Sequence, residues 1–418
     1  MKTTPIKGTR DYLPREVRVR DYVQNQILNV YRQSGFVRIA TPMLEDMENL
    51  DKSDGGDNLN LIFKILKRGE KLDKALAAND TQKLADLGLR YDLTLPLSRY
   101  YAANQDALPS PCKVIQTDRV FRAERPQKGR MREFVQCDID ILGDESTNAE
   151  IELIDVTARA LRAVDLTDVV IHINDRRMLR SMLLQFGFAP ETLDTVCVSF
   201  DKLDKIGEQG VTAELTEKDM PADAVAQLSR FLQAGDFSLA HVAKLLRAQD
   251  RALAEDLLRV MDAVRAVANG AYAIAYTPQL VRGQGYYTGV VFEVTCPGFA
   301  GAVGGGGRYD DMVGKFLGQK VPAVGFSIGF ERIIGILLDK GFAVPEERAS
   351  LALLYRADAD FADVLQKAAA LRTQYAVTVL AAGKKVAKQL ERLADDGCSA
   401  VCFYEKYPEV KQLSGHEA

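Results

Sequence analysis

The sequence predicts an α+β protein in which strand-rich and helical regions occupy different parts of the chain. Apolar residues recur at helical spacing almost throughout residues 176–270, whereas strand-like runs dominate before and after this stretch. Beyond residue 344 short strand-like and helical runs alternate, which is typical of a small α/β unit with a parallel sheet. With 418 residues, the chain is long enough for two or three domains.

The individual elements follow from periodicity and from stop signals. Gly35 ends an amphipathic helix, and Pro42 interrupts the strand after it because proline cannot donate to a ladder. The expected order up to residue 175 is a helix over 20–35, a strand over 36–44, a strand over 61–66, a charged helical stretch over 71–88, strand-like residues near 89–94, strands over 113–122 and 132–142, and a capped helix over 145–164.

Strand signals return after the helical stretch. The expected order there is strands over 271–281 and 285–295, a glycine cluster over 298–311, a strand that runs into a helix over 321–341, and then strand, helix, strand, helix and strand between 350 and 405. The sequence therefore predicts four parts, which are residues 1–175, 176–270, 271–344 and 345–418.

Composition and charge narrow the classes of function. The net charge is −4, which excludes a general nucleic-acid coat but allows a local basic patch. No apolar run approaches the roughly 20 residues of a membrane span, and the N-terminus lacks an apolar signal core, so we expect a cytoplasmic protein without membrane contact. The six cysteines form no CxxC pair and there are three histidines, so we expect reduced thiols and no metal held by the protein.

The strand pair around residue 127 carries an unusual concentration of positive charge. Six basic residues lie between Arg119 and Arg132, with Arg122 on a strand and Lys128 in the turn. A guanidinium group presents a planar fork that matches phosphate oxygens, and a rigid strand places it with precision. The alternative is a solvated hairpin balanced by its own glutamates and aspartates.

Glycine-rich stretches and shared strand faces supply further candidates. Arg282 precedes Gly283 and Gly285, and four glycines precede Arg308, where they permit close approach of a ligand to the backbone; without GK[ST] this is no P-loop. Arg332 stands near a helix start, where phosphate is favoured. Tyr286 and Tyr287 alternate, so at most one should face a pocket. Asp92 and Thr94 share a face if they lie on a strand, as do Asp138 and Asp140, and a structural hydrogen bond is the alternative for each.

Five motifs in this order carry a resemblance. FRAERPQKGRMREF, GFSIGFERI and GFVRIATPMLE resemble the three motifs of class II aminoacyl-tRNA synthetases, and LVRGQGYYTG and GGGGRYD resemble stretches peculiar to the histidyl-tRNA synthetase family. The resemblance covers nearly the whole chain. It implies an antiparallel catalytic sheet, a helical insertion, a C-terminal anticodon-binding domain and a homodimer. It also implies a histidine–tRNA ligase that uses ATP and Mg²⁺ to form histidyl-adenylate and then charges tRNA(His).

The resemblance also implies roles for individual residues. Arg122, Arg282 and Arg332 would stabilise the charge that builds on the phosphates, and no side-chain nucleophile would be needed. The ATP-binding residues would be Arg122, Glu124, Arg130, Phe134 and Arg332; the histidine-binding residues Asp92, Thr94, Gln136, Asp140, Arg282, Tyr286, Tyr287, Gly304 and Gly306; and the residues that meet the acceptor end of the tRNA Arg125, Gln127 and Lys128.

Two departures from the family keep other functions open. Gly285 stands where the family usually has an acidic residue, and the C-terminal domain offers three strands and two helices, with its last strand and helix missing or replaced by KYPEVKQLSGHEA. One alternative is a regulatory subunit of ATP phosphoribosyltransferase, which shares the fold but does not charge tRNA. The other is a synthetase-like enzyme with a non-tRNA acceptor.

Overall fold

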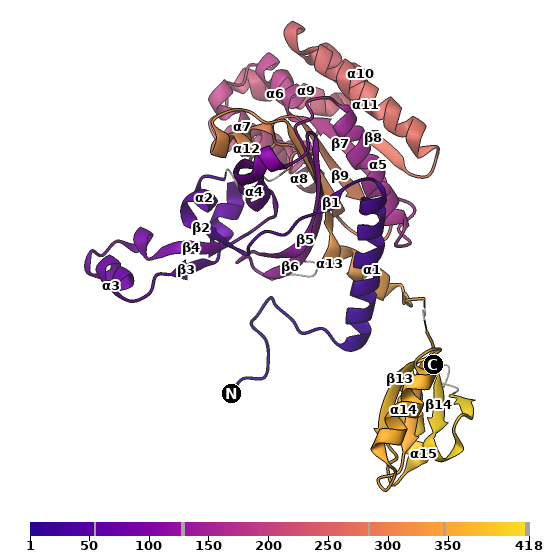
Figure 1. Cartoon of the computed structure of the whole chain (residues 1–418). Helices are drawn as coiled ribbons and strands as arrows, with labels where there is room; N and C mark the ends of the chain where they lie inside the picture. Colours follow the sequence, from indigo (N-terminus) through magenta and orange to yellow (C-terminus); the bar gives the residue numbers. More distant parts are fainter. Residues whose placement is uncertain (54–55, 127–129, 283–284, 346–347, 414–418) are drawn as a thin grey trace. The chain divides into compact units, whose positions relative to one another are not determined.

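The computed structural model describes residues 1–53, 56–126, 130–282, 285–345 and 348–413. The chain forms two compact units, Met1–Phe342 and Ala343–Ala418 (Figure 1). The first contains one large, mostly antiparallel sheet with helices on its faces, and the second a small α/β sheet. The α+β class is therefore confirmed, while the finer division of the first unit into two catalytic segments and an insertion stays a prediction.

The large sheet has eight strands in the order β1-β5-β6-β11-β10-β9-β7-β8. All pairs from β5 to β7 are antiparallel, and β1 and β8 add parallel edges. The strands are β1 (Val37–Arg38), β5 (Cys112–Phe121), β6 (Glu133–Leu142), β7 (Val170–Asp175), β8 (Ala273–Tyr276), β9 (Val290–Thr295), β10 (Ala302–Arg308) and β11 (Ala323–Gly329). The four glycines before Arg308 thus lie inside β10, at the centre of the sheet.

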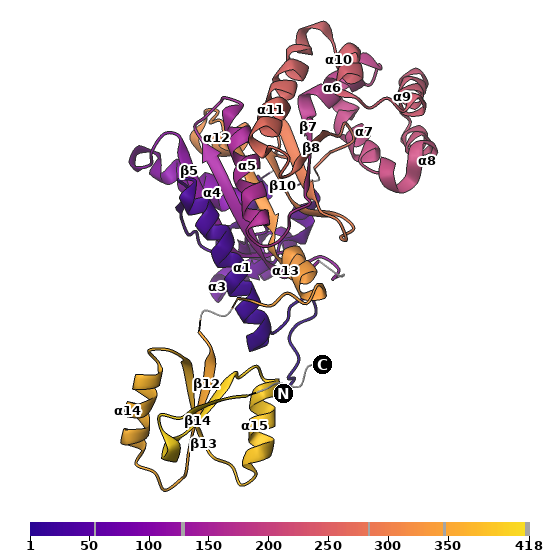
Figure 2. The same ribbon diagram turned by 90° about the vertical axis from the view of Figure 1, so that its right-hand side faces the viewer.

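Helices cover both faces of this sheet. Helices α1 and α5 pack together on one face, and α4 and α12 pack together over the other (Figures 1 and 2). The bounds are α1 (Pro14–Gln33), α4 (Thr94–Asn104), α5 (Asn148–Arg162), α12 (Asp310–Leu317) and α13 (Phe330–Asp339). Helix α1 begins six residues before the predicted start because proline is favoured in a first helical turn, and Gly35, with φ +83°, follows its end.

A second, three-stranded sheet has the order β2-β4-β3. The strand expected over 36–44 is interrupted around Pro42, as expected, whereas the helix expected over 71–88 is wrong in its length and ends at Ala77. Asn79 has φ 50°, a left-handed conformation that stops the helix, so the chain turns back as a strand. The elements are β2 (Leu44–Asp46), α2 (Met47–Asp51), β3 (Lys64–Leu66), α3 (Glu70–Ala77) and β4 (Ala85–Leu89).

The stretch predicted to be helical consists of helices, which lie together at the top of Figure 2. Buried apolar side chains such as Leu179, Phe200 and Leu257 recur along them and form their shared core. The helices are α6 (Arg176–Gln185), α7 (Leu193–Phe200), α8 (Leu203–Glu217), α9 (Ala222–Ala234), α10 (Leu239–Leu245) and α11 (Ala252–Ala268).

The second unit contains one strand more than the sequence predicts. Its sheet has the order β13-β12-β14-β15, in which β12 pairs parallel with β13 and β14, and β15 pairs antiparallel with β14. This short strand lies within the segment KYPEVKQLSGHEA, so the described part of that segment adds a strand, and the described residues after β15 form no further helix. The elements are β12 (Ser350–Tyr355), α14 (Phe361–Leu371), β13 (Ala376–Ala381), α15 (Val386–Asp395), β14 (Ala400–Phe403) and β15 (Val410–Gln412).

One ion pair ties a helix to the large sheet, and a second joins two helices that pack near it. Arg308 on β10 bonds both carboxylate oxygens of Glu150 at 2.6 and 2.7 Å, so this arginine is structural rather than part of a binding site. Arg20 on α1 bonds both oxygens of Glu331 at 2.6 and 2.7 Å and thereby fixes the first turn of α13.

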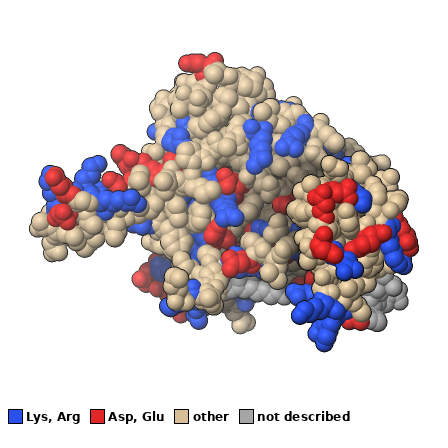
Figure 3. Space-filling model, turned by 60° about the horizontal axis from the view of Figure 1, so that its bottom comes forward, with Lys and Arg blue, Asp and Glu red and all other residues tan. Residues whose placement is uncertain are grey.

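The face of the molecule drawn in Figure 3 is mixed in charge. On the face drawn in Figure 3, Lys and Arg side chains are interspersed with Asp and Glu. None of the described helices combines the length and the apolar composition that crossing a lipid bilayer requires.

Candidate active site

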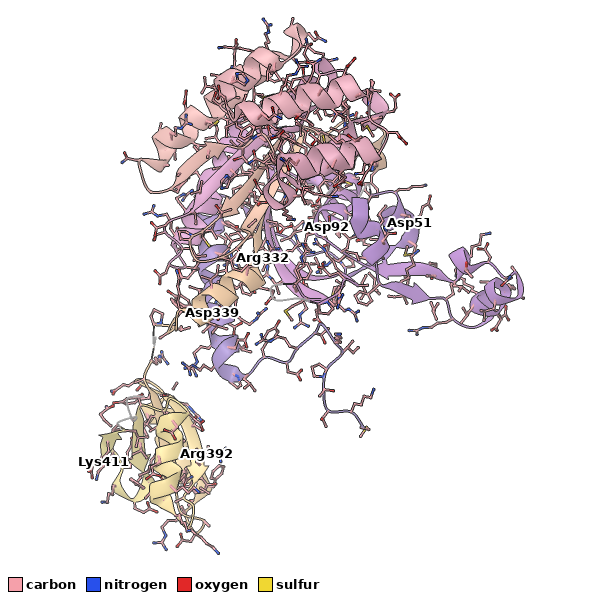
Figure 4. The ribbon with its side chains drawn as sticks, turned by 180° about the vertical axis from the view of Figure 1, so that it is seen from behind. Asp51, Asp92, Arg332, Asp339, Arg392 and Lys411 are labelled. Atoms are coloured by element: carbon pink, nitrogen blue, oxygen red, sulfur yellow. The ribbon has the colours of Figure 1, made fainter. Side chains whose placement is uncertain are left out.

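A cavity of about 480 Å³ lies over the β6-β11-β10 part of the large sheet. It brings together residues that are far apart in sequence, from Thr94 near the start of α4 to Arg332 on α13. In Figure 4 Arg332 lies at the start of α13, whereas Asp339 lies at the far end of the same helix. The candidate residues that line the cavity are Thr94, Arg122, Glu124, Arg130, Phe134, Gln136, Asp140, Arg282, Tyr286, Tyr287, Gly304, Gly306 and Arg332.

Strand β6 supplies one wall, with side chains that alternate toward the cavity. Phe134, Gln136, Asp138 and Asp140 all line it, as the period of two residues in a strand requires. The neighbouring strand β11 places a serine and two glycines opposite the last three of them. A Cβ atom on Gly325 would lie 1.9 Å from Oδ1 of Asp140, so the glycine is needed for the carboxyl to occupy its place.

Four arginines converge on one side of the cavity. Among the described residues Arg122 and Arg332 form no salt bridge; Arg122 donates to the carbonyl of Tyr91 at 3.0 Å, and Arg332 donates to the carbonyl of Ala302. Arg130 lies 3.4 Å from Glu124. Burial, and then repulsion from the other cavity arginines, lowers the pKa of Arg332. Two arginines without a carboxylate partner in the described part of the chain, next to two that have one, indicate an anionic ligand.

Arg282 is held against the middle of the sheet. Its Nη1 atom donates to Glu293 on β9 at 2.7 Å, and its guanidinium group lies directly over Gly305, where a Cβ atom would come within 2.6 Å of Nη1. The Cζ atom of Arg122 lies 5.1 Å from the centre of the Phe134 ring. A planar ligand group that binds beside Arg122 would therefore also contact the face of an aromatic ring.

Buried carboxyls gather on another side. Asp138 and Asp140 line the cavity, and Asp92 lies behind Tyr286, whose hydroxyl donates to it at 3.3 Å. Burial raises the pKa of Asp140 to about 7, although the Tyr309 hydroxyl, which donates to it at 2.6 Å, opposes this shift. Burial likewise raises the pKa of Asp92, and the positive charge of Arg122 opposes that shift.

Two premises of the sequence analysis are wrong here. Asp92 and Thr94 do not lie on a strand, because β4 ends at Leu89 and Thr94 is the first residue of α4. Tyr286 and Tyr287 both line the cavity, because β9 begins only at Val290 and the segment before it does not alternate as a strand would. Thr94, Tyr286 and Tyr287 therefore reach the cavity without strand parity, whereas Asp92 is not among its lining residues.

Other candidates lie elsewhere. Gly285 lines a second cavity of about 390 Å³, next to Arg176, whose Nη1 donates to the Gly285 carbonyl at 3.3 Å, and it is not among the residues that line the first cavity. Arg125 is exposed outside the cavity. Gln127 and Lys128 lie outside the described residues, so their expected contact with the tRNA acceptor end stays a prediction.

Sequence reasoning missed several residues of the cavity. Asp138 was placed on the same strand face as Asp140 but was given no role in the site. Because Gln136, Asp138 and Asp140 are two residues apart, the alternation of a strand was enough to predict that all three line the cavity. Tyr309 and Ser327 had no comparable signal, because each depends on which strand lies beside β6. Glu331 had none either, since its partner Arg20 is 311 positions away.

Comparison with known proteins assigns the chain to a family. A family model described as "Histidyl-tRNA synthetase" matches residues 8–333, more than half of the chain. The chain belongs to the histidyl-tRNA synthetase family. A histidine--tRNA ligase of Leifsonia xyli subsp. xyli is 43% identical over 415 residues, which cover 95% of this chain and 93% of the relative. A probable histidine--tRNA ligase of Tropheryma whipplei is 38% identical over 85% of this chain and 84% of its own length.

Solved structures agree with this family assignment. The crystal structure of histidyl-tRNA synthetase from Nostoc sp. PCC 7120 has a TM-score of 0.80 and 26% identity, covering 99% of this chain and 95% of that one. A Bacillus halodurans structure described as an ATP phosphoribosyltransferase regulatory subunit/histidyl-tRNA synthetase has a TM-score of 0.77 at 19% identity, covering 96% of this chain and 98% of that one. The second likeness shows the shared fold alone.

Proposed function

We propose that this protein is a histidine–tRNA ligase, which activates histidine with ATP and transfers the histidyl group to tRNA(His). The observation that carries the proposal is the divided charge of one cavity. Arg122, Arg130, Arg282 and Arg332 offer binding for a triphosphate, and the carboxyls of Asp138 and Asp140 offer acceptors for N–H groups of an amino acid. Arg122 also stabilises the charge of Asp92, so it stands where the two substrates would meet.

The arginines act on the phosphates. The histidine carboxylate attacks the α-phosphorus of ATP, the bond to pyrophosphate breaks, and histidyl-adenylate forms. Arg122 and Arg282 bear on the α-phosphate, where negative charge builds during attack, and Arg130 and Arg332 hold the outer phosphates. Because Arg122, Arg282 and Arg332 are held by hydrogen bonds before substrate arrives, the cost of reorganisation at the moment of reaction is small.

The remaining cavity residues orient the two substrates. Phe134 stacks on adenine while Glu124 orients ATP, and the backbone from Gly304 to Gly306 forms a flat floor under the histidine. Asp92, Thr94, Gln136 and Asp140 surround its α-amino group, and Tyr287 contacts the imidazole. In the second step a ribose hydroxyl of the tRNA attacks the adenylate, so no side chain of the protein forms a covalent intermediate.

We also propose that Mg²⁺ accompanies the triphosphate. No three His, Cys, Asp or Glu side chains of the described residues lie together as a metal site, but Mg²⁺ commonly binds phosphate oxygens with the help of only one or two carboxylates. Glu124 fits that need, because it lines the cavity and its contact with Arg130 is long, at 3.4 Å. When bound, the ion neutralises the leaving pyrophosphate.

The partners follow from the reaction and from one surface feature. We propose a homodimer that joins through the region around β1, an edge strand of two residues, where Val37, Met43 and Leu44 are 64%, 40% and 49% exposed. Arg125 is placed to meet the acceptor end of the tRNA. We place the enzyme in the cytoplasm, where charged tRNA is used.

Two assays on the purified protein test the function. Histidine-dependent exchange of pyrophosphate into ATP should occur, and labelled histidine should be joined to tRNA. Exchange without charging would favour a non-tRNA acceptor. Histidine binding without exchange would favour the regulatory subunit, whose fold the Bacillus halodurans structure shares.

The hydroxyl of Tyr309 provides a pH test. Ionised Asp140 holds an N–H donor of the substrate more strongly than the protonated carboxyl does, because protonation removes the negative charge. The value of kcat/KM for histidine should therefore fall as the pH drops below about 7. Tyr309→Phe removes a hydrogen bond that favours the ionised form, so the pKa rises and the fall should begin at higher pH, by about one pH unit. The titration of free histidine is the same for both proteins, and an unshifted profile would contradict the role of Asp140.

A further inference from the structure

Two buried acceptors in the cavity have no partner. Oδ1 of Asp138 and Oε1 of Gln136 form no hydrogen bond among the described residues, although the two side chains are only 5% and 9% exposed. The two residues also touch, since Nε2 of Gln136 lies 3.4 Å from Oδ2 of Asp138 and donates to Oγ of Ser327 at 2.9 Å. A buried acceptor without a donor is costly, so both atoms indicate a donor that a ligand brings.

The charges around Asp138 define the kind of donor. Arg122 is the cation that acts on it, whereas Asp140 and Asp92 add negative charge, and the Ser327 hydroxyl opposes the resulting shift. Burial, and then the carboxyl of Asp140, raises the pKa of Asp138 well above its usual range. The other titratable groups that interact with Asp138 are Tyr31, Tyr287, Tyr309 and Cys137. None of these supplies positive charge, so a cationic donor is favoured.

The position of Asp138 on the strand selects which part of the substrate it meets. It stands between Gln136, which lies toward Phe134 and the arginines, and Asp140, which lies toward Gly325 and Tyr309. The reacting carboxylate of the amino acid has to lie beside the arginines, and its α-ammonium is two bonds from that carboxylate carbon. The ammonium therefore falls near Gln136 and Asp138, on the side of the cavity that Asp140 also lines.

We infer that Asp138 is a further substrate-binding residue that receives the α-ammonium of histidine together with Gln136. The inference rests on the proposed function, and it adds a carboxylate to the residues assigned to the amino group. One ammonium N–H donates to Oδ1 of Asp138 and another to Oε1 of Gln136. A protonated Asp138 in the free protein is neutral. When the ammonium binds, that proton passes to solvent, so the carboxylate and the ammonium form a pair that is again neutral.

Asp138→Asn keeps the shape of the side chain and removes the carboxylate. Titration calorimetry with histidine should show a dissociation constant raised about ten- to hundredfold, as expected for loss of a hydrogen bond between charged groups. Measured near neutral pH in buffers of different ionisation enthalpy, the wild type should release more protons on binding than the variant does. The KM for ATP should stay unchanged.

Histidine analogues that lack either the carboxylate or the ammonium show which of these groups Asp138 contacts. Histamine keeps the ammonium and should be weakened by Asp138→Asn, whereas 3-(imidazol-4-yl)propionate lacks it and should bind both proteins equally. Equal loss for the propionate would place Asp138 at the imidazole and overturn the inference, as would histidine binding that Asp138→Asn leaves unchanged. A wild type that binds no histidine would instead overturn the proposed function itself.

Two controls separate binding from folding. Asp106→Asn, an exposed aspartate in a short helical turn after α4, should change none of these values. The folded protein holds the Asp138 proton more tightly than the unfolded chain does, so wild-type stability falls as the pH rises above the usual carboxyl range, and Asp138→Asn should lack this part of the decline. If Asp138→Asn fails to fold, Asp138→Ser provides the same comparison of ligands.

Discussion

Arg282→Ala should lower kcat/KM for histidine-dependent pyrophosphate exchange by about a thousandfold or more, which in practice abolishes adenylate formation. Arg282 lies over Gly305 and is held by Glu293 at 2.7 Å, so its guanidinium is fixed before the substrates bind. An alanine cannot contact an α-phosphate, and no neighbouring side chain can replace the fork. Arg282→Lys keeps the charge without the fork and should recover only part of the rate.

The loss must come from the site and not from unfolding. The ion pair of Arg282 with Glu293 is partly exposed, at 24% and 30%, so its removal should cost at most about 1 kcal/mol of the free energy of unfolding. Arg259→Ala is a matched control, because it removes an arginine paired with Asp256 on the surface of α11 and should leave exchange unchanged. A fully active Arg282→Ala protein would show that the cavity has been assigned wrongly.

The parts of this site that could be read from sequence are those that follow strand parity within one strand. The alternation of Gln136, Asp138 and Asp140 along β6 holds in the structure, and so does the strand that runs into the helix carrying Arg332. Parity failed at Asp92 and Thr94 because a helix starts at Thr94, and at Tyr286 and Tyr287 because the chain there is not yet a strand.

What sequence could not provide is which elements lie side by side. Tyr309 reaches Asp140 only because β10 and β11 return beside β6, and Arg20 reaches Glu331 across 311 positions. Strand β15 was missed for another reason: its three residues are too few to show an alternating pattern, and its pairing with β14 defines it. Contacts between distant segments thus determine which residues line the cavity, whereas the local sequence pattern determines which helices and strands carry them.

Gly306→Ala should disrupt the pairing of the central strands of the large sheet and so lower the free energy of unfolding. A Cβ atom there would lie 1.9 Å from the backbone carbonyl oxygen of Gly325 and 2.8 Å from the Phe292 ring, at the centre of the β9-β10-β11 pairing. Backbone atoms of a central strand cannot move aside without breaking the ladder, so we expect a loss of roughly 3 kcal/mol or more of the free energy of unfolding. The urea midpoint and the melting temperature measure this loss, and an unchanged midpoint would contradict it.

The neighbouring glycine should behave differently, which makes the pair informative. A Cβ atom on Gly305 meets the end of the Arg282 side chain at 2.6 Å rather than backbone, so Gly305→Ala should keep the fold and displace the guanidinium. A displacement on the order of 1 Å lowers exchange about a hundredfold. Gly335→Ala in α13, where a Cβ atom meets open space, should keep full activity and slightly raise the melting temperature. If Gly305→Ala instead unfolds like Gly306→Ala, the role of this glycine is packing of the sheet, and the close approach of Arg282 to β10 does not serve catalysis.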